Sequence, residues 1–409
     1  MSRLRTVVAL AFLSALAPWL AGATGRPVLV TAATPQPGGE TNPFYELPSP
    51  LPPGQPGALL RSEPMAAPPG VKARRILYRS TGLDGEQVVV SGAVFAPERE
   101  PPPRGFPVLA VGHNTTGVAP ACAPSLDPFE PLPGADAAFY QEQVEEFVDA
   151  GFAAVATDYR GLGAPADVHP YLVGEAAAYD VLDAARASRY VPGLLLRPET
   201  ILWGHSQGGH AAAWAGQVVA DYAPDLQVIG VVLAAPAAQP AALVAAATRD
   251  LSAETPLTGY VASLAYTWEI VFPGLASAPA LRPAGRALAQ IISRQCIWTV
   301  SSAYADGPLG DYLDPEVFST ETWAGLLERN AAGGSPVKSP VLVVQGTDDP
   351  LVPSAATRAF VRKLCHNGTS VRLNLYPEVG HGGVIRTAMP DILVWAGDRL
   401  SRTPAGSTC

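Results

Sequence analysis

One pentapeptide, Gly204-His205-Ser206-Gln207-Gly208, constrains the fold of this chain more than any other feature. An apolar run ending at Trp203 precedes it, and an Ala-rich run beginning at Gly209 follows it. This order predicts a strand, a sharp turn and a helix, with Ser206 in a strained backbone conformation at the turn. Glycines two residues before and two residues after the serine fit that geometry, because a Cβ at either position would crowd neighbouring backbone. The pattern therefore predicts that Ser206 is a nucleophile.

Strand-like and helix-like segments alternate on both sides of this turn. Short apolar runs predict buried parallel strands, and the segments between them carry Ala, Val and Leu at helical spacing. Strands are expected at residues 75–78, 88–95, 108–113, 152–159, 201–203, 226–233, 340–345 and 371–376. Helices are expected at residues 140–150, 174–190, 209–219, 354–364 and 391–399. This alternation predicts an α/β fold with a mostly parallel, doubly wound sheet.

A long helical stretch at residues 239–336 interrupts the alternation. Helices are expected there at residues 241–248, 257–272, 284–300 and 320–328. Because the stretch is too long for a loop in such a fold, it is interpreted as an inserted helical cap or lid. The α/β core is then expected in two parts, residues 71–238 and 337–409. Residues 24–70 are rich in Pro and Gly and predict an N-terminal arm, anchored by its apolar group at residues 42–45.

The first 23 residues have the pattern of a secretory signal peptide. Arg3 and Arg5 precede an apolar run, and Ala21-Gly22-Ala23 has the small residues of a cleavage site. The apolar run is short for a membrane span, so cleavage near Ala23 and secretion are expected. The net charge of −9 and the lack of a basic run give no indication of a nucleic-acid partner. No protein partner is evident from the sequence.

The chain contains four cysteines, Cys122, Cys296, Cys365 and Cys409. An even number in an exported chain predicts two disulfides, for which three connectivities are open. None of the four lies in a C-x-x-C pair, so no zinc or other metal site is expected. No organic cofactor is expected either.

A nucleophilic serine needs a base, and the base needs an orienting acid. His381 lies in a Gly-rich turn after the last predicted strand, and it is the predicted base. Asp348 and Asp349 follow the first strand after the cap. Asp349 is the preferred acid, because the following Val352-Pro353 step would anchor the next helix at this turn. Asp348 is the alternative.

Two backbone N–H groups are expected to stabilise an oxyanion. One is that of Gln207, directly after the nucleophile. The other is that of Thr115, with Thr116 as an alternative, in the loop after the strand that ends at His113. Structural or packing roles are expected for three further histidines, His113, His205 and His210. The last two, His169 and His366, are expected at the surface.

These residues resemble the secretory lipase family of the α/β-hydrolases. The resemblance rests on residues 56–62, the 113–117 loop with Cys122-Ala123-Pro124-Ser125, the 158–163 turn, the Ser206 pentapeptide, residues 349–353 and Gly380-His381. It implies an α/β-hydrolase fold with a helical lid and disulfides Cys122–Cys296 and Cys365–Cys409. It also implies hydrolysis of carboxylic esters, including acylglycerols. One departure is Asn114, where the family loop often has Gly.

The expected function is therefore that of a secreted serine ester hydrolase, a lipase or esterase, that forms an acyl-enzyme on Ser206. Its expected partners are a small or lipid ester substrate and, transiently, a lipid interface. Two alternatives remain open. The same site would support acyl transfer to an alcohol, and a non-catalytic lipid-binding homologue would keep the fold without turnover.

Overall fold

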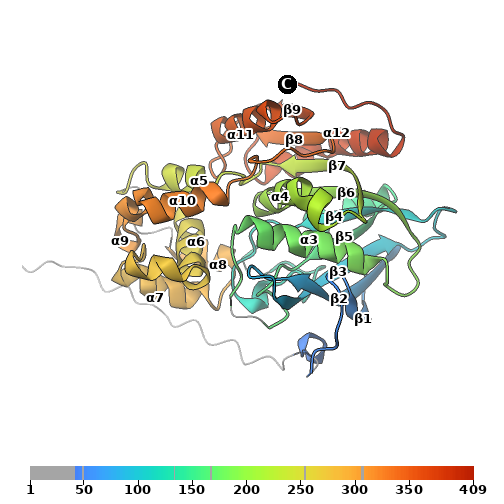
Figure 1. Ribbon diagram of the computed structural model, residues 1–409, viewed down its shortest axis with the longest axis horizontal. Helices are drawn as coiled ribbons and strands as arrows, with labels where there is room; N and C mark the ends of the chain where they lie inside the picture. The colour runs from blue at the N-terminus through green and yellow to red at the C-terminus, as the bar shows by residue number, and fades with distance from the viewer. Residues whose placement is uncertain (1–41, 48–49, 133, 166–167, 253–254, 305–307) are drawn as a thin grey trace, which may run out of the picture. The chain divides into compact units, whose positions relative to one another are not determined.

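The computed structural model describes residues 42–47, 50–132, 134–165, 168–252, 255–304 and 308–409. These residues form one nine-stranded sheet in the order β1-β2-β3-β5-β4-β6-β7-β8-β9 (Figure 1). The strands are β1 (Leu59–Met65), β2 (Val71–Thr81), β3 (Gln87–Pro97), β4 (Phe106–Gly112), β5 (Ala153–Thr157), β6 (Leu196–His205), β7 (Gln227–Ala234), β8 (Val341–Gly346) and β9 (Val371–Tyr376). The predicted α/β class is confirmed.

The sheet is antiparallel at one side and parallel over the rest. β1, β2, β3 and β5 pair antiparallel, whereas β5, β4, β6, β7, β8 and β9 pair parallel. Every residue of β4, β5 and β8 is buried, as expected for parallel strands covered on both faces. The carboxyl ends of the parallel strands therefore share one edge, which carries the loops of the candidate site.

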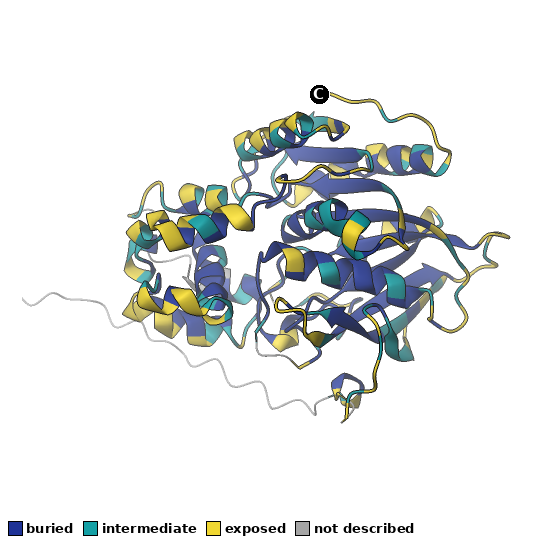
Figure 2. Cartoon of the chain, viewed as in Figure 1, coloured by how far each residue is buried: buried dark blue, intermediate teal, exposed yellow. Residues whose placement is uncertain are grey.

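Helices cover both faces of the sheet (Figure 2). One core joins the sheet to α3, α4 and α11, and a second core joins its other face to α1, α2 and α12. Along β6, Leu202 belongs to the first core and Trp203 to the second, because successive strand side chains point to opposite faces. These helices are α1 (Phe139–Gln143), α2 (Glu145–Asp149), α3 (Gly174–Ser188), α4 (Gln207–Tyr222), α11 (Ser354–His366) and α12 (Gly383–Leu400).

The segment between β7 and β8 is helical and lies beside the sheet (Figure 1). Its own core includes Trp268 and Trp323, whose rings stack with centroids 6.0 Å apart. The same core includes Val118, Tyr171 and Val352 from loops of the α/β part. Its helices are α5 (Pro240–Ala247), α6 (Leu257–Val271), α7 (Pro283–Ile292), α8 (Ile297–Tyr304), α9 (Leu309–Tyr312) and α10 (Glu321–Arg329).

Three helices differ from the sequence prediction. The helix expected at 284–300 is divided into α7 and α8, because Cys296 forms an isolated bridge with Gly117 between them. The helix expected at 140–150 is divided into α1 and α2 at Val144, whose φ is −130°. The last helix begins at Gly383 rather than 391 and continues through Pro390.

The N-terminal arm contains more regular secondary structure than its Pro- and Gly-rich composition predicts. Residues 59–65 form the edge strand β1, which the sequence analysis does not predict. Within the short 3₁₀ helix η1 (Pro43–Tyr45), Phe44 and Tyr45 are buried, and the Tyr45 hydroxyl hydrogen-bonds Ser125 at 2.7 Å. The predicted signal peptide and the start of the arm lie outside the described residues. Within the described chain, no helix combines the length and apolarity that a membrane span requires.

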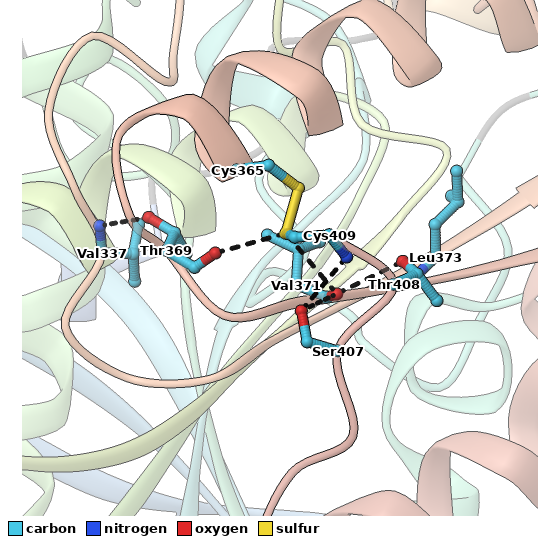
Figure 3. The surroundings of a disulfide bond; sticks show 8 residues. All are labelled: Val337, Cys365, Thr369, Val371, Leu373, Ser407, Thr408 and Cys409. Carbon is cyan, nitrogen blue, oxygen red and sulfur yellow. Dashed lines mark hydrogen bonds between the residues drawn. A yellow bond between two sulfur atoms is a disulfide. The ribbon is translucent and has the colours of Figure 1, made fainter.

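The chain ends along the other edge of the sheet. A disulfide joins Cys365 of α11 to Cys409 (Figure 3). The N–H of Thr408 donates to the carbonyl of Val371 in β9 at 2.7 Å, and its hydroxyl accepts from the N–H of Leu373 at 3.1 Å. The tail therefore satisfies backbone groups that an open edge strand would expose.

Candidate active site

Ser206 lies at the junction of β6 and α4 in a strained conformation. Its φ and ψ are 56° and −117°, a region that non-Gly residues rarely occupy. A Cβ on Gly204 would lie 2.0 Å from the carbonyl oxygen of Gly208, and a Cβ on Gly208 would lie 1.8 Å from that of Gly112. The two glycines therefore allow the sharp turn that the pentapeptide predicts.

Asp349 and His381 meet in the loops that follow β8 and β9. The Asp349 Oδ2 lies 2.7 Å from His381 Nδ1 and also accepts from Gln345 Nε2 at 2.9 Å. Its Oδ1 accepts from the backbone N–H of Leu351 at 2.9 Å and of Val352 at 2.8 Å. The structure thus brings Asp349 to the histidine, whereas Asp348 is exposed.

Burial alone would raise the pKa of Asp349. The hydrogen bond and charge of His381, with the hydrogen bonds from Val352 and Gln345, outweigh it and hold the pKa of this carboxyl below its usual value. Asp349 is therefore ionised at neutral pH. An ionised carboxylate at Nδ1 fixes the proton of His381 on that nitrogen and leaves Nε2 with its lone pair.

The ring of His381 packs against the ring of His205, directly before Ser206. The two centroids are 4.5 Å apart, and His205 Nε2 lies 3.1 Å from the backbone oxygen of His381. Burial, and then the nearby charge of His381, lower the pKa of His205 to about 3. His205 is therefore neutral, and its Nε2–H donates to that carbonyl. The contact places the His381 loop beside the elbow.

The loop after β4 carries the two alternative oxyanion residues, Thr115 and Thr116, and both are buried. Its first residue, His113, has both ring nitrogens facing backbone carbonyl oxygens, and burial lowers its pKa to about 4. The loop is attached to the helical segment, because Thr116 accepts from the N–H of Ile297 at 2.9 Å. The Cys122–Cys296 disulfide makes a second attachment.

The prediction that His169 lies at the surface is wrong. His169 is 1% exposed, and its Nε2 lies 2.9 Å from the side-chain nitrogen of Gln207. The neighbouring Tyr171 hydroxyl lies 2.9 Å from the Thr115 hydroxyl. Sequence reasoning misses both residues, because they lie between predicted elements and no spacing rule connects them to the pentapeptide. His366, by contrast, is exposed as predicted.

Metal binding is predicted to be absent, and the described residues offer the following test of side-chain arrangement. No group of three or more His, Cys, Asp or Glu side chains in these residues is arranged to hold a metal ion. All four cysteines are in disulfides, Cys122–Cys296 and Cys365–Cys409, which are the pairs that the family resemblance implies.

The parallel sheet, the serine elbow and the acid–histidine pair on later loops define the class of the protein as an α/β-hydrolase of the lipase and esterase type. Residues 138–408 match the sequence profile of the family described as "Secretory lipase". The match spans more than half of the chain, and the protein belongs to the secretory lipase family.

Curated relatives that match this chain over most of their length are also lipases by name. The chain is 27% identical over 382 residues to a probable inactive lipase of Mycobacterium tuberculosis, covering 89% of this chain and 82% of the relative. It is 24% identical over 389 residues to a secreted triacylglycerol lipase of Malassezia globosa, covering 90% of this chain and 80% of the relative.

Solved structures show the same fold. Candida antarctica lipase A in its closed state superposes with a TM-score of 0.76 at 20% identity, covering 90% of this chain and 87% of that chain. The rice cell wall degrading esterase LipA from Xanthomonas oryzae gives a TM-score of 0.67 at 19% identity, covering 86% of this chain and 100% of that chain.

Proposed function

We propose that this protein is a secreted serine carboxylic-ester hydrolase in which Ser206, His381 and Asp349 form the catalytic triad. The observation that carries the proposal is the 2.7 Å contact between Asp349 Oδ2 and His381 Nδ1, on a loop that packs beside the Ser206 elbow. A serine, a base within its reach and an acid that orients the base are what acyl transfer requires.

The reaction proceeds in two halves through an acyl-enzyme. His381 Nε2 takes the Ser206 proton as Oγ attacks the ester carbonyl, and it then gives that proton to the departing alcohol. In the second half, His381 takes a proton from water, whose oxygen attacks the acyl carbon, and returns the proton to Ser206. Asp349 stays ionised and stabilises the imidazolium in both halves. No metal or cofactor takes part in these steps.

The backbone N–H groups of Thr115 and Gln207 are proposed to bind the oxyanion of each tetrahedral intermediate. Gln207 is the first residue of α4, where N–H groups have no helical partner and the helix dipole favours negative charge. Asn114, where the family loop often has Gly, precedes the second donor and is half-buried.

Residues 239–336 are proposed to form a cap over this site. The cap core includes Val118 and Val352, which come from the loops of the oxyanion and acid residues. Such an apolar cap suits an acyl chain, and the Malassezia relative is named a triacylglycerol lipase. Acylglycerols and other apolar esters are therefore the proposed substrates.

Two alternatives use the same fold. Acyl transfer to an alcohol would follow if an alcohol replaced water in the second half of the reaction. A non-catalytic role is suggested by the name of the Mycobacterium tuberculosis relative, a probable inactive lipase. The Asp349–His381 hydrogen bond beside an elbow serine favours a functional site in this chain.

Hydrolysis of p-nitrophenyl esters from acetate to palmitate, with a triacylglycerol emulsion, tests the proposal. The wild type is expected to hydrolyse the series and to be labelled by a fluorophosphonate, and Ser206→Ala is expected to lose both. Ser188→Ala removes a buried helical serine outside the site and serves as the matched control. Retained turnover in Ser206→Ala would exclude the assignment, and products with added alcohol would reveal acyl transfer.

Secretion is tested separately. The proposed cleavage after Ala23 predicts that the protein recovered from the culture medium begins at Thr24. Mass spectrometry of the secreted N-terminal peptide checks this, and a mature protein that keeps residues 1–23 would contradict it.

A further inference from the structure

A three-residue segment, His169-Pro170-Tyr171, contacts the side chains of both proposed oxyanion donors. Tyr171 hydrogen-bonds the Thr115 hydroxyl at 2.9 Å, and the His169 ring hydrogen-bonds the Gln207 amide at 2.9 Å. All four residues are buried, with exposures of 4% or less. One segment therefore holds the loop of Thr115 and the first residue of α4, which are 92 residues apart in sequence (Thr115 to Gln207).

The direction of the His169 hydrogen bonds follows from its partners. Its Nδ1 lies 3.0 Å from the backbone oxygen of Arg160, an acceptor, so Nδ1 carries the proton. Nε2 is then an acceptor, and the Gln207 side chain must donate to it. Burial lowers the pKa of His169 to about 3, so the ring stays neutral and the bond persists at the pH of ester hydrolysis.

The segment itself is fixed from three sides. His169 stacks on Tyr159, with centroids 5.5 Å apart and planes inclined by 21°. The backbone at His169 packs closely on Gly161, where a Cβ would lie 2.3 Å from the His169 nitrogen. Trp268 in the cap donates its indole N–H to the carbonyl of Tyr171 at 2.8 Å. The segment is thus a rigid support that also touches the cap.

We propose that His169 and Tyr171 are positioning residues of the oxyanion hole, which fix the backbone N–H groups of Gln207 and Thr115 by holding their side chains. This inference rests on the proposed function. Donors that are already aligned stabilise a developing oxyanion without reorganising. A loss of alignment therefore reduces the stabilisation of the transition state more than it reduces the binding of the ester. The effect is therefore expected in kcat and not in KM.

The test uses Tyr171→Phe, His169→Leu and His169→Gln in the full-length enzyme with p-nitrophenyl butyrate. Tyr171→Phe and His169→Leu are expected to lower kcat roughly 10- to 100-fold with KM within about threefold. Their affinity for a trifluoromethyl ketone, whose serine adduct carries an oxyanion, is expected to fall in proportion. His169→Gln keeps an acceptor for Gln207 and is expected to recover most of the activity.

Tyr222→Phe is the control, because it removes a tyrosine hydroxyl that also bonds a threonine, Thr81, at 2.7 Å. This hydroxyl donates in addition to Asp183, and it lies at the opposite end of α4 from Ser206. Its kcat is expected to be unchanged. A kcat within twofold of wild type in both Tyr171→Phe and His169→Leu would overturn the inference, as would a lower kcat with unchanged ketone affinity. If His169→Leu does not fold, Tyr171→Phe decides alone. Failure of the proposed function is distinct, since wild type would then form no ketone adduct.

Discussion

At the scale of single residues, the surroundings of the site contain histidines that do not change charge near neutral pH. Burial lowers the pKa of His113 and His210 to about 4 and that of His169 and His205 to about 3. Each ring has a nitrogen in contact with a backbone carbonyl oxygen. These four rings therefore act as neutral hydrogen-bonding groups that orient loops, and they add no positive charge around Ser206.

The two neighbouring aspartates are expected to respond differently to amide substitution. Asp349→Asn should lower kcat by about 10⁴-fold, because an amide no longer selects the productive tautomer of His381. Asp348→Asn, the matched control on an exposed side chain, should stay within about twofold. Steady-state kinetics with p-nitrophenyl butyrate measures both. A larger loss of kcat in Asp348→Asn than in Asp349→Asn would show that Asp348 is the orienting acid.

A second buried carboxylate, Asp158, makes stability depend on pH. Burial raises its pKa from 3.8 to about 6, although hydrogen bonds from Ser125 and Ser91 lower it. The unfolded chain releases this proton near pH 4, whereas the folded chain keeps it until about pH 6. The contribution of Asp158 to stability is therefore fully present below about pH 4 and is lost as the pH rises through 6.

Comparison of wild type with Asp158→Asn by urea unfolding at several pH values tests this linkage. The variant lacks the titrating group, so the stability difference between the two proteins should become less favourable to wild type by about 3 kcal/mol from pH 4 to pH 7.5. A difference that is constant over this range would show that Asp158 keeps an ordinary pKa.

At the scale of structural elements, the two disulfides have different surroundings. Cys122–Cys296 joins the loop region beside Thr115 and Thr116 to the residue directly before α8, in the helical segment between β7 and β8. Cys365–Cys409 joins α11 to the tail that covers β9 (Figure 3). Both bonds constrain the unfolded chain, but only the first lies against the 113–117 loop, which carries the proposed oxyanion donor Thr115.

Double serine variants separate these contributions. Cys365→Ser with Cys409→Ser should lower the free energy of unfolding by about 3 kcal/mol and leave kcat unchanged. Cys122→Ser with Cys296→Ser should lower both stability and kcat, because the segment directly after the 113–117 loop loses its covalent attachment to the helical segment between β7 and β8. Urea unfolding and ester kinetics on both proteins measure the two effects. Equal kcat values in the two double variants would contradict the distinction.

At the scale of the whole molecule, the described chain has separate hydrophobic cores on the two faces of the sheet and in the helical segment between β7 and β8, the proposed cap. Trp323→Ala should lower the free energy of unfolding of this helical segment by about 4 kcal/mol, because the fully buried ring stacks on Trp268 and contacts Phe318. Hydrogen exchange should then increase in α6 and α10 before it increases in β6 and β8. A uniform increase over sheet and cap would show that the cores unfold as one unit.

The sequence is most informative where local pattern and burial agree. The parallel strands were predictable because their short apolar runs are buried on both faces, and the 349–381 contact follows from where two strands end. The sequence does not predict β1, because this strand is formed by its antiparallel pairing with β2 and its own composition does not favour a strand. The burial of His169 depends on its contact with Gln207, which is distant in sequence, so the local pattern does not predict it. The division of the 284–300 helix depends on the bridge between Cys296 and Gly117, which is equally distant.

The Cys122–Cys296 bond spans 174 residues and encloses the Ser206 elbow in one covalent ring. A single peptide-bond cut anywhere between these cysteines opens the ring and leaves both pieces joined through sulfur. An extracellular protease that nicks a surface turn there would therefore not release a fragment. Such a nicked enzyme should run as one band on a denaturing gel without reductant and as two bands with it.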